Sequence, residues 1–190
     1  MSGHTSDKVR AVVLSALMVL SVFGGTVAFA GTAAAQTADS GSITPSTVDE
    51  QTTNEHNVSV DVTLNTSDGT DQDVFVDLPD ALNTSSSSIT SLSVTGPGSG
   101  NVSVGSGSVN SNGNVSFAVS DSTGSGDESV TLAFNITSVQ APSVSSDTTA
   151  TAQLKIDDGQ DGSIESSLGF QQLTIQDVVG PSGSTRSADG

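Results

Sequence analysis

Asn57–Asn65 reads NVSVDVTLN and is the stretch that decides the fold. Val58, Val60, Val62 and Leu64 alternate with polar residues, so one face of an extended chain is aliphatic and the other is polar. This period of two is typical of a β-strand with one buried face. The stretch therefore predicts a strand of a sheet that packs on a hydrophobic core.

The same alternation recurs along the rest of the chain, between turns rich in Gly, Ser, Asn and Asp. About eight such segments follow one another, and no amphipathic helix is predicted between them. Regular short strands of this kind predict an all-β, antiparallel, two-sheet sandwich of the Ig-like or cohesin-like type. The expected inward residues outside the first strand are Val74, Val76, Leu78, Ile89, Leu92, Val94, Val102, Val104, Val109, Val115, Phe117, Val119, Val130, Leu132, Phe134, Ile136, Ala150, Ala152, Leu154, Ile156, Phe170, Leu173 and Ile175.

The N-terminal segment has the three parts of a secretory signal. Lys8 and Arg10 precede an apolar run from Ala11 to Ala30, and small residues end at Ala35. This order predicts a signal-peptide helix over residues 1–35, cleaved between Ala35 and Gln36. A retained membrane anchor is the alternative, because about 20 apolar residues can span a bilayer. No paired arginine precedes the run, which favours the general secretory route and a transient membrane contact.

The chain beyond residue 35 divides, by composition, into a spacer (36–42), the sandwich domain (43–179) and a flexible tail (180–190). It holds 20 acidic residues against Lys155 and Arg186. Such a chain repels itself in dilute salt, whereas at about 1 M salt the Debye length falls to about 3 Å and the repulsion is screened. The charge favours a hypersaline environment and excludes nucleic acid and anionic membranes as partners.

The segment DKVRAVVLSALMVLSVFGGTVAFAGTAAA, from Asp7 to Ala35, closely resembles the signal peptides of haloarchaeal S-layer and cell-surface glycoproteins. ITPSTVDEQTTNEHNVSVDVTL and VQAPSVSSDTTATAQLKI resemble modules of the same proteins less specifically. The resemblance implies an extracellular, cell-surface location. Typical members end in a Thr-rich stalk, a P-G-F motif and a hydrophobic helix, none of which this sequence contains. The chain is then either released and held by other proteins or a piece of a longer one.

Six sequons of the form N-x-S/T lie in the part of the chain that the signal pattern leaves as the mature protein. The sequon fixes the acceptor for N-glycosylation, which needs an exposed site. Five of the six asparagines fall on the polar parity of a predicted strand and one in a loop, so we expect outward glycans on some of them. The candidates are Asn57, Asn65, Asn83, Asn101, Asn114 and Asn135.

The acidic stretch IDDGQDGSIE is the candidate cation site. Asp157, Asp158, Asp161 and Glu165 carry the oxygen ligands that calcium prefers, and the two glycines allow a tight loop. The stretch departs from the EF-hand pattern where that pattern needs a third and a twelfth ligand, and a solvated acidic turn is the alternative. Calcium or another divalent cation is the one cofactor that the sequence suggests.

Catalysis is not expected. The chain has no cysteine, so disulfides and thiol chemistry are excluded. His56 is the one histidine after residue 35, and we interpret it as an exposed polar residue rather than as part of a triad. Phe75 is the one aromatic ring expected on an outer face, which is a poor platform for sugar.

These patterns together predict a secreted, N-glycosylated structural or interaction module of a halophilic archaeal surface, associated with an S-layer. Its expected partners are other cell-surface or S-layer proteins. Two other functions stay open. One is a cohesin-like or adhesin binding module, which an exposed apolar patch or a free strand edge would favour. The other is an extracellular hydrolase with two carboxyl groups about 5 to 10 Å apart.

Overall fold

A computed structural model describes residues 36–65, 69–121 and 126–178 of the chain. In these residues the chain forms two β-sheets, with β3 and β9 as the longest strands. The strands are β1 (Thr37–Thr44), β2 (Thr47–Asp49), β3 (Thr53–Asn65), β4 (Gln72–Asp77), β5 (Ser88–Thr95), β6 (Val102–Val104), β7 (Ser108–Val109), β8 (Asn114–Asp121), β9 (Asp127–Gln140), β10 (Thr148–Asp158) and β11 (Ser166–Gln176).

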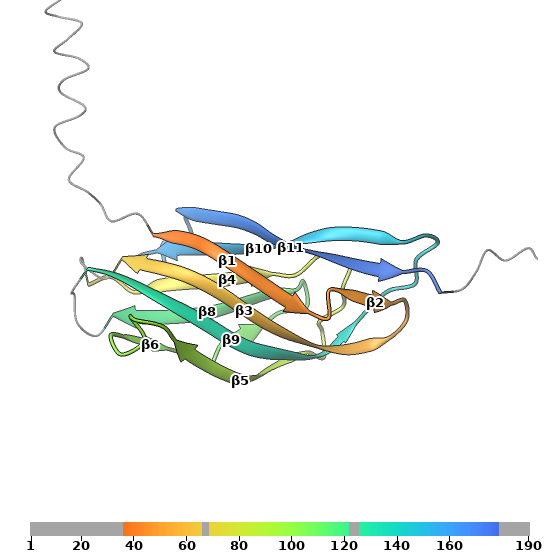
Figure 1. Cartoon of the computed structure of the whole chain (residues 1–190), viewed down its shortest axis with the longest axis horizontal. Helices are drawn as coiled ribbons and strands as arrows, with labels where there is room; N and C mark the ends of the chain where they lie inside the picture. The colour runs from red at the N-terminus through yellow and green to blue at the C-terminus, as the bar shows by residue number, and fades with distance from the viewer. Residues whose placement is uncertain (1–35, 66–68, 122–125, 179–190) are drawn as a thin grey trace, which may run out of the picture. The chain divides into compact units, whose positions relative to one another are not determined.

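The two sheets face one another as a sandwich, as Figure 1 shows. Sheet A has the order β1-β3-β9-β5, and sheet B has the order β2-β11-β10-β4-β8-β6, with β7 also paired to β8. All neighbours are antiparallel except β2, which runs parallel to β11. The predicted all-β, two-sheet class is confirmed.

The core lies between the sheets and consists of aliphatic side chains with two phenylalanines. The alternation of β3 puts Val58, Val60, Val62 and Leu64 inside, each at most 2% exposed. Phe117 of β8 and Phe134 of β9 meet edge to face across the core, with ring centroids 4.7 Å apart. Burying such side chains supplies the main favourable free energy of folding, about 25 cal/mol for each Å² of apolar surface.

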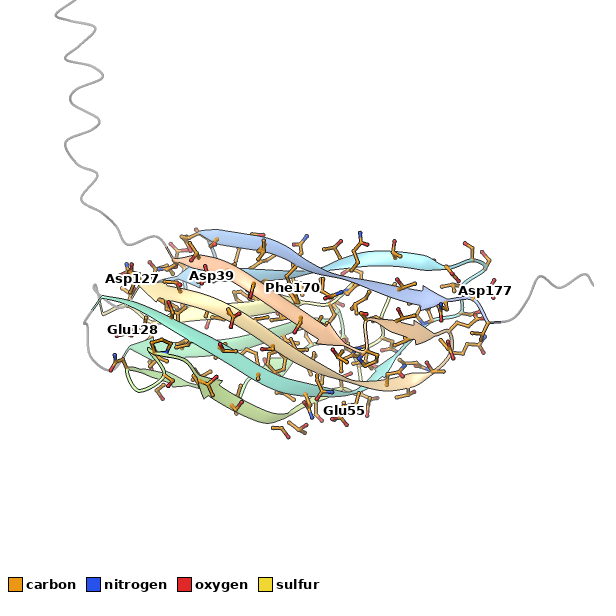
Figure 2. All side chains as sticks on the ribbon, viewed as in Figure 1. Asp39, Glu55, Asp127, Glu128, Phe170 and Asp177 are labelled. Carbon is orange, nitrogen blue, oxygen red and sulfur yellow. The ribbon has the colours of Figure 1, made fainter. Side chains whose placement is uncertain are left out.

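Two bulges change which face a strand presents. In β11, Phe170 is the extra residue between the pairs Ala152–Gln171 and Gln153–Gly169, one position before the paired glutamines where a bulge was expected. Phe170 packs against the border of the core, where it lies half-buried over Gly41 of β1, beside which Figure 2 labels it. In β5 the register shifts between Thr90 and Ser93. This shift explains why Ile89 and Leu92 share a side.

The strand count and one boundary differ from the sequence prediction. Eleven strands are present in the described residues instead of about eight, because β1 and β2 were not predicted and β6 and β7 share one predicted segment. Residues 37–42, predicted as a spacer, belong to β1 and pair with β3. The sequence TADSGSIT gave no signal, because β1 buries one large aliphatic residue, Ile43, at its end.

The predicted signal helix (1–35), its cleavage site and the predicted tail (180–190) lie outside the described residues, apart from Gln36. Within the described ranges, no helix has the length and apolar character needed to cross a bilayer.

Replacing Gly41 by alanine should destabilise the protein. A Cβ atom at Gly41 would stand 2.5 Å from Cδ2 of Phe170, so the ring has to move off β1. We expect Gly41→Ala to lower the free energy of unfolding by about 1 kcal/mol or more in denaturant titration. Gly100→Ala is the matched control, because a Cβ there meets no atom within 4 Å. Equal stability of the two variants would contradict the packing of Phe170 on β1.

Candidate glycosylation and cation sites

The structure separates the six sequon asparagines by exposure. Asn57 and Asn83 are exposed, while Asn101, Asn114 and Asn135 are half-buried. Asn65 is 7% exposed although its parity points outward, so the expectation of an open site there is wrong. Its main-chain oxygen accepts a hydrogen bond from the Gln72 side chain, which folds over the end of β3.

Two of the sequons lie directly opposite each other. Asn57 of β3 is the register partner of Asn135 of β9, on the outer face of sheet A. Directly opposed residues of an antiparallel pair have Cβ atoms about 5 Å apart. Both asparagines line a shallow hollow on this face together with Ser42, Ser59 and Ser91. Two bulky glycans do not fit side by side at this spacing.

Three sequon amides donate a hydrogen bond to a carboxylate. Asn135 Nδ2 donates to Glu55 Oε1 at 2.6 Å. The Asn101 amide donates to Glu128, and the Asn114 amide donates to Asp77. Asn57 and Asn83 differ, because the Asn83 amide contacts the neutral Gln140 at 3.3 Å and Asn57 stands exposed beside the hollow.

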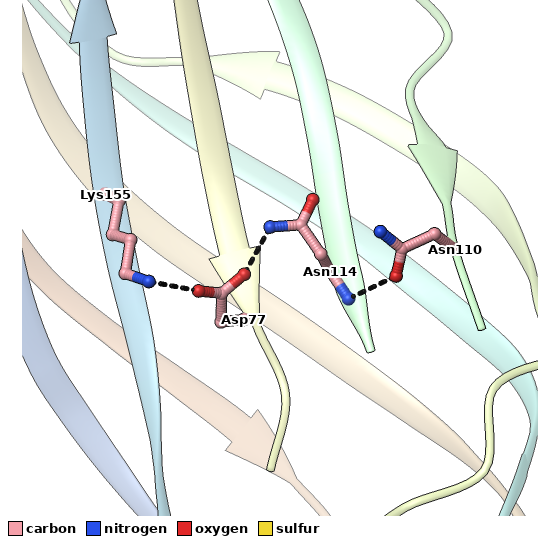
Figure 3. A network of polar contacts seen from close by, with 4 residues as sticks. All are labelled: Asp77, Asn110, Asn114 and Lys155. Carbon is pink, nitrogen blue, oxygen red and sulfur yellow. Dashed lines mark hydrogen bonds and ion pairs between the residues drawn. The ribbon is translucent and has the colours of Figure 1, made fainter. Parts of the chain in front are cut away.

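The Asp77 contact belongs to a chain of polar groups on the outer face of sheet B, drawn in Figure 3. Lys155 of β10 forms an ion pair with Asp77 of β4. Asp77 accepts from the amide of Asn114 on β8, whose main-chain N–H donates to Asn110 Oδ1 at 3.0 Å. Lys155 is the one lysine or arginine in the described residues, and this chain of contacts ties three strands together. Sequence patterning does not find such a contact, since the three residues are far apart in the chain.

Hydroxyl groups hold the carboxylates on the outer face of sheet A. Ser40 and Thr131 donate to the two oxygens of Asp61, each at 2.6 Å, and these bonds lower the pKa of Asp61. Thr63 donates to Asp39 at 2.8 Å. Figure 2 labels Asp39 with Glu55, Asp127 and Glu128 on this sheet. The hydroxyl groups of Ser40 and Thr131 therefore favour the ionised form of Asp61 on this face.

The predicted cation loop is closed by its own backbone. Asp157 is 3% exposed, and its carboxylate accepts from the main-chain N–H groups of Asp161 at 3.2 Å and Gly162 at 2.9 Å. Glu165 accepts from the N–H of Asp158 at 2.7 Å, and Asp161 from that of Ser163 at 2.8 Å. Three of the four carboxylates are thus directed at backbone donors of the turn, and the fourth, that of Asp158, accepts from the Thr70 hydroxyl group.

Asp157 also faces Asp73, its register partner on β4. Burial raises the pKa of Asp73 and the negative charge of Asp157 adds to this effect, while a hydrogen bond from Gln160 opposes it. No three acidic or histidine side chains in the described ranges are arranged to hold a metal ion. The carboxylates of the loop therefore serve to close its turn, and the calcium site stays a prediction.

Removing the Asp157 carboxylate should destabilise the protein regardless of calcium. Asp157→Ala leaves two backbone N–H groups without their acceptor, which typically lowers the free energy of unfolding by about 1 to 3 kcal/mol. We expect the same loss in calcium and in chelator, measured by thermal unfolding. Asp158→Ala is the control, because Asp158 accepts from an exposed hydroxyl, that of Thr70. A loss that appears in calcium and vanishes in chelator would establish a metal site, because a bound ion stabilises the folded state.

His56 is buried, contrary to the expectation of an exposed polar residue. It continues the even-numbered inward face of β3 and is 1% exposed, so the parity of the strand was the signal that could have placed it. Nδ1 lies 3.0 Å from the carbonyl oxygen of Pro45 and so carries the proton, and Nε2 has no hydrogen-bond partner. The ring borders an apolar cavity of about 10 Å³ with Leu82, Leu173 and Ile175. The contact that the described residues offer the imidazole nitrogens is the main-chain carbonyl oxygen of Pro45, so His56 has no carboxylate partner among them.

Burial lowers the pKa of His56 below its usual value of 6.5, although the hydrogen bond to Pro45 opposes this. The unfolded chain therefore takes up a proton below about pH 6.5 that the folded protein does not. Stability should fall as the pH drops, by at most about 1.4 kcal/mol per unit from this group, until the lowered pKa is reached. We expect His56→Gln to remove this slope between about pH 6.5 and 5 in denaturant titrations. Parallel pH profiles of the two proteins would contradict a neutral, buried His56.

Comparison with known proteins places similarity in part of the chain. No family model matches it. A cell surface glycoprotein of Haloferax gibbonsii is 49% identical over 75 residues, which cover 40% of this chain and 8% of that protein. The chain thus matches a small portion of a much longer haloarchaeal surface protein.

Solved structures with similar strands include BcpA, the major pilin subunit of Bacillus cereus, at 12% identity and a TM-score of 0.41. That likeness covers 73% of this chain and 39% of the pilin. A C-terminal fragment of the major pilin GBS80 of Streptococcus agalactiae matches at 7% identity and a TM-score of 0.36, over 75% of this chain and 54% of the fragment. Likeness at this level says nothing about function. The chain is similar, over two fifths of its length, to a haloarchaeal cell surface glycoprotein.

Proposed function

We propose that this protein is an N-glycosylated structural module of a haloarchaeal cell surface, exported by the general secretory route and held among other surface or S-layer proteins. The observation that carries the proposal is the similarity to the Haloferax cell surface glycoprotein, at 49% identity over 75 residues. The name of that protein states that it lies at the cell surface and carries sugar. We extend both properties, the surface location and the glycosylation, to this chain as part of the proposal.

The side chains of the described residues agree with a structural role. The core is made of aliphatic residues without disulfides, and the outer face of sheet A carries hydroxyl groups paired with carboxylates. Such a surface stays hydrated in concentrated salt, where the repulsion between carboxylates is screened. Cations from the salt would gather near this face and neutralise the charge of its carboxylates, without binding at one specific site.

A protein-binding module of the cohesin or adhesin kind is the second candidate. The observation that favours it is β5, a strand at the edge of sheet A that hydrogen-bonds to β9 on one side and to no other described strand. A free edge is a ready template for a second chain. The two candidates overlap if the partner is itself a surface protein.

Site-resolved mass spectrometry of the protein from the cell envelope and the medium tests the proposal. We expect an N-terminus at Gln36 and glycans at Asn57 and Asn83, the two exposed sequons. Asn65 should be unmodified because it is buried. Asn135 should be unmodified while Asn57 carries a glycan, because the two side chains are directly opposed. Asn57→Gln should then raise the occupancy of Asn135.

A protein without sugar on any sequon, or one that keeps residues 1–35, would contradict the proposal. Glycans on Asn57 and Asn135 in the same molecule would leave the surface role intact and contradict the steric argument. Asn112→Gln is a suitable control, since Asn112 is an exposed asparagine outside any sequon.

A further inference from the structure

One segment along a side of the sandwich has no charged side chain of its own, although Glu128 of β9 lies against two of its residues, Gly98 and Asn101. Residues 81–120 contain no acidic, basic or histidine side chain, in a chain with a net charge of -17. This stretch includes β5, β6 and β7 and most of β8. Figure 1 shows β5 and β6 along the same margin of the two sheets. In a protein that otherwise repels its own kind, this margin is neutral.

The neutral margin is also where the core is least covered. The inward side chains of β3, β4, β8 and β9 are buried, whereas those of β5, β6 and β7 are all half-exposed. Gly107, before β7, lies so close to Ile89 of β5 and to Phe117 that a Cβ atom would come within 2.9 Å of both. The two sheets thus meet here through an aliphatic seam, made of Ile89, Leu92, Val94, Val102, Val104 and Val109.

The other three sheet edges are protected. Phe170 covers β1 at Gly41, and the hydroxyl group of Ser166 accepts a hydrogen bond from the N–H of Ala38. The edge strand β2 is only three residues long and includes Asp49. At the opposite edge of sheet B, β6 has three residues and β7 has two. Short, charged or covered edges resist pairing with other chains. In contrast, β5 has eight uncharged residues and one free side, with a bulge at Ser91 and Leu92 that leaves Ser93–Thr95 regular.

We propose that two copies of this chain associate through this side, with β5 of one copy antiparallel to β5 of the other and the aliphatic seam buried between them. The distribution of charge is the reason to expect a second copy of this chain on this surface. An equally acidic chain is repelled by every other face, but here it meets a neutral surface identical to its own. Antiparallel pairing of the same strand is the arrangement that a two-fold axis produces. The inference deepens the proposed structural role by naming a partner and a surface.

Salt should strengthen this association. Two chains of net charge -17 repel each other beyond the interface at about 0.1 M salt, where the Debye length is about 10 Å. At about 1 M salt the length falls to about 3 Å, and only contacts across the interface remain. High salt also strengthens burial of apolar surface when the ions are excluded from it. A contact between oppositely charged partners would show the reverse dependence.

Analytical ultracentrifugation of the protein, exported from a haloarchaeal host, tests the proposal. We expect a reversible dimer at about 1 M salt that dissociates at about 0.1 M salt. Ser93→Asp adds a charge at an exposed position of β5, and Leu92→Asp adds one within the seam. Each should weaken the dimer at least about tenfold. Gln172→Asp is the matched control, because Gln172 is exposed on β11 and its variant carries the same added charge; its dimer constant should stay within about twofold.

Thermal unfolding in the same buffers checks that each variant is folded, and Ser93→Asp carries the test if Leu92→Asp is unstable. A wild-type protein that is monomeric at both salt concentrations would overturn the proposal, as would a dimer that Ser93→Asp leaves intact. Equal weakening by Gln172→Asp would also overturn it, because net charge alone would then explain the effect. Each of these results leaves the glycan and envelope measurements unaffected, so this inference and the proposed function fail separately.

Discussion

The pairing of β3 with β9 is the contact on which the rest of the sandwich depends. The two strands match residue for residue from His56 to Asn65, so their inward side chains form one continuous apolar surface. Every other strand of sheet A pairs with one of these two, and sheet B packs against their inner face. The strands hold 13 and 14 residues, which makes this pairing the longest ladder of the described chain.

An acidic chain without disulfides depends on such a ladder for stability. Its carboxylates oppose compaction in dilute salt, and folding must therefore rest on burial of aliphatic surface and on hydrogen bonds between strands. The acidic groups are held by local donors: hydroxyl groups at Asp61, backbone N–H groups at Asp157 and Lys155 at Asp77. Each such contact is worth little when exposed. Together they hold acidic side chains on the outer faces of both sheets, while residues 81–120, which include β5 to β7, have no acidic side chain.

The polar groups described above close turns and join neighbouring strands. The one buried histidine packs against apolar neighbours, and the predicted cation loop uses its carboxylates to close its own turn. The features that distinguish this sandwich are an anionic sheet with two directly opposed sequons and an uncharged edge. Both concern what the protein presents to its neighbours.

The sequence by itself determined the fold class and most of the core. A period of two with one aliphatic face predicts a strand with one buried face, and without predicted helices between the strands that face has to pack on another sheet. The aliphatic and aromatic residues of β3, β8 and β9 that were predicted to point inward are all buried for this reason, whereas His56 of β3 was misplaced. The tertiary structure decided what periodicity does not encode. Phe170 came to lie at a bulge of β11, half-buried against the border of the core, and polar β1 became a strand because β3 offered it a free edge. Asn57 came to face Asn135, a pairing that the sequence pattern does not predict because β3 and β9 are far apart in the chain. Asn65 lost its exposure beside Gln72, and Asp157 found backbone donors at Asp161 and Gly162, which are local contacts that depend on turn geometry.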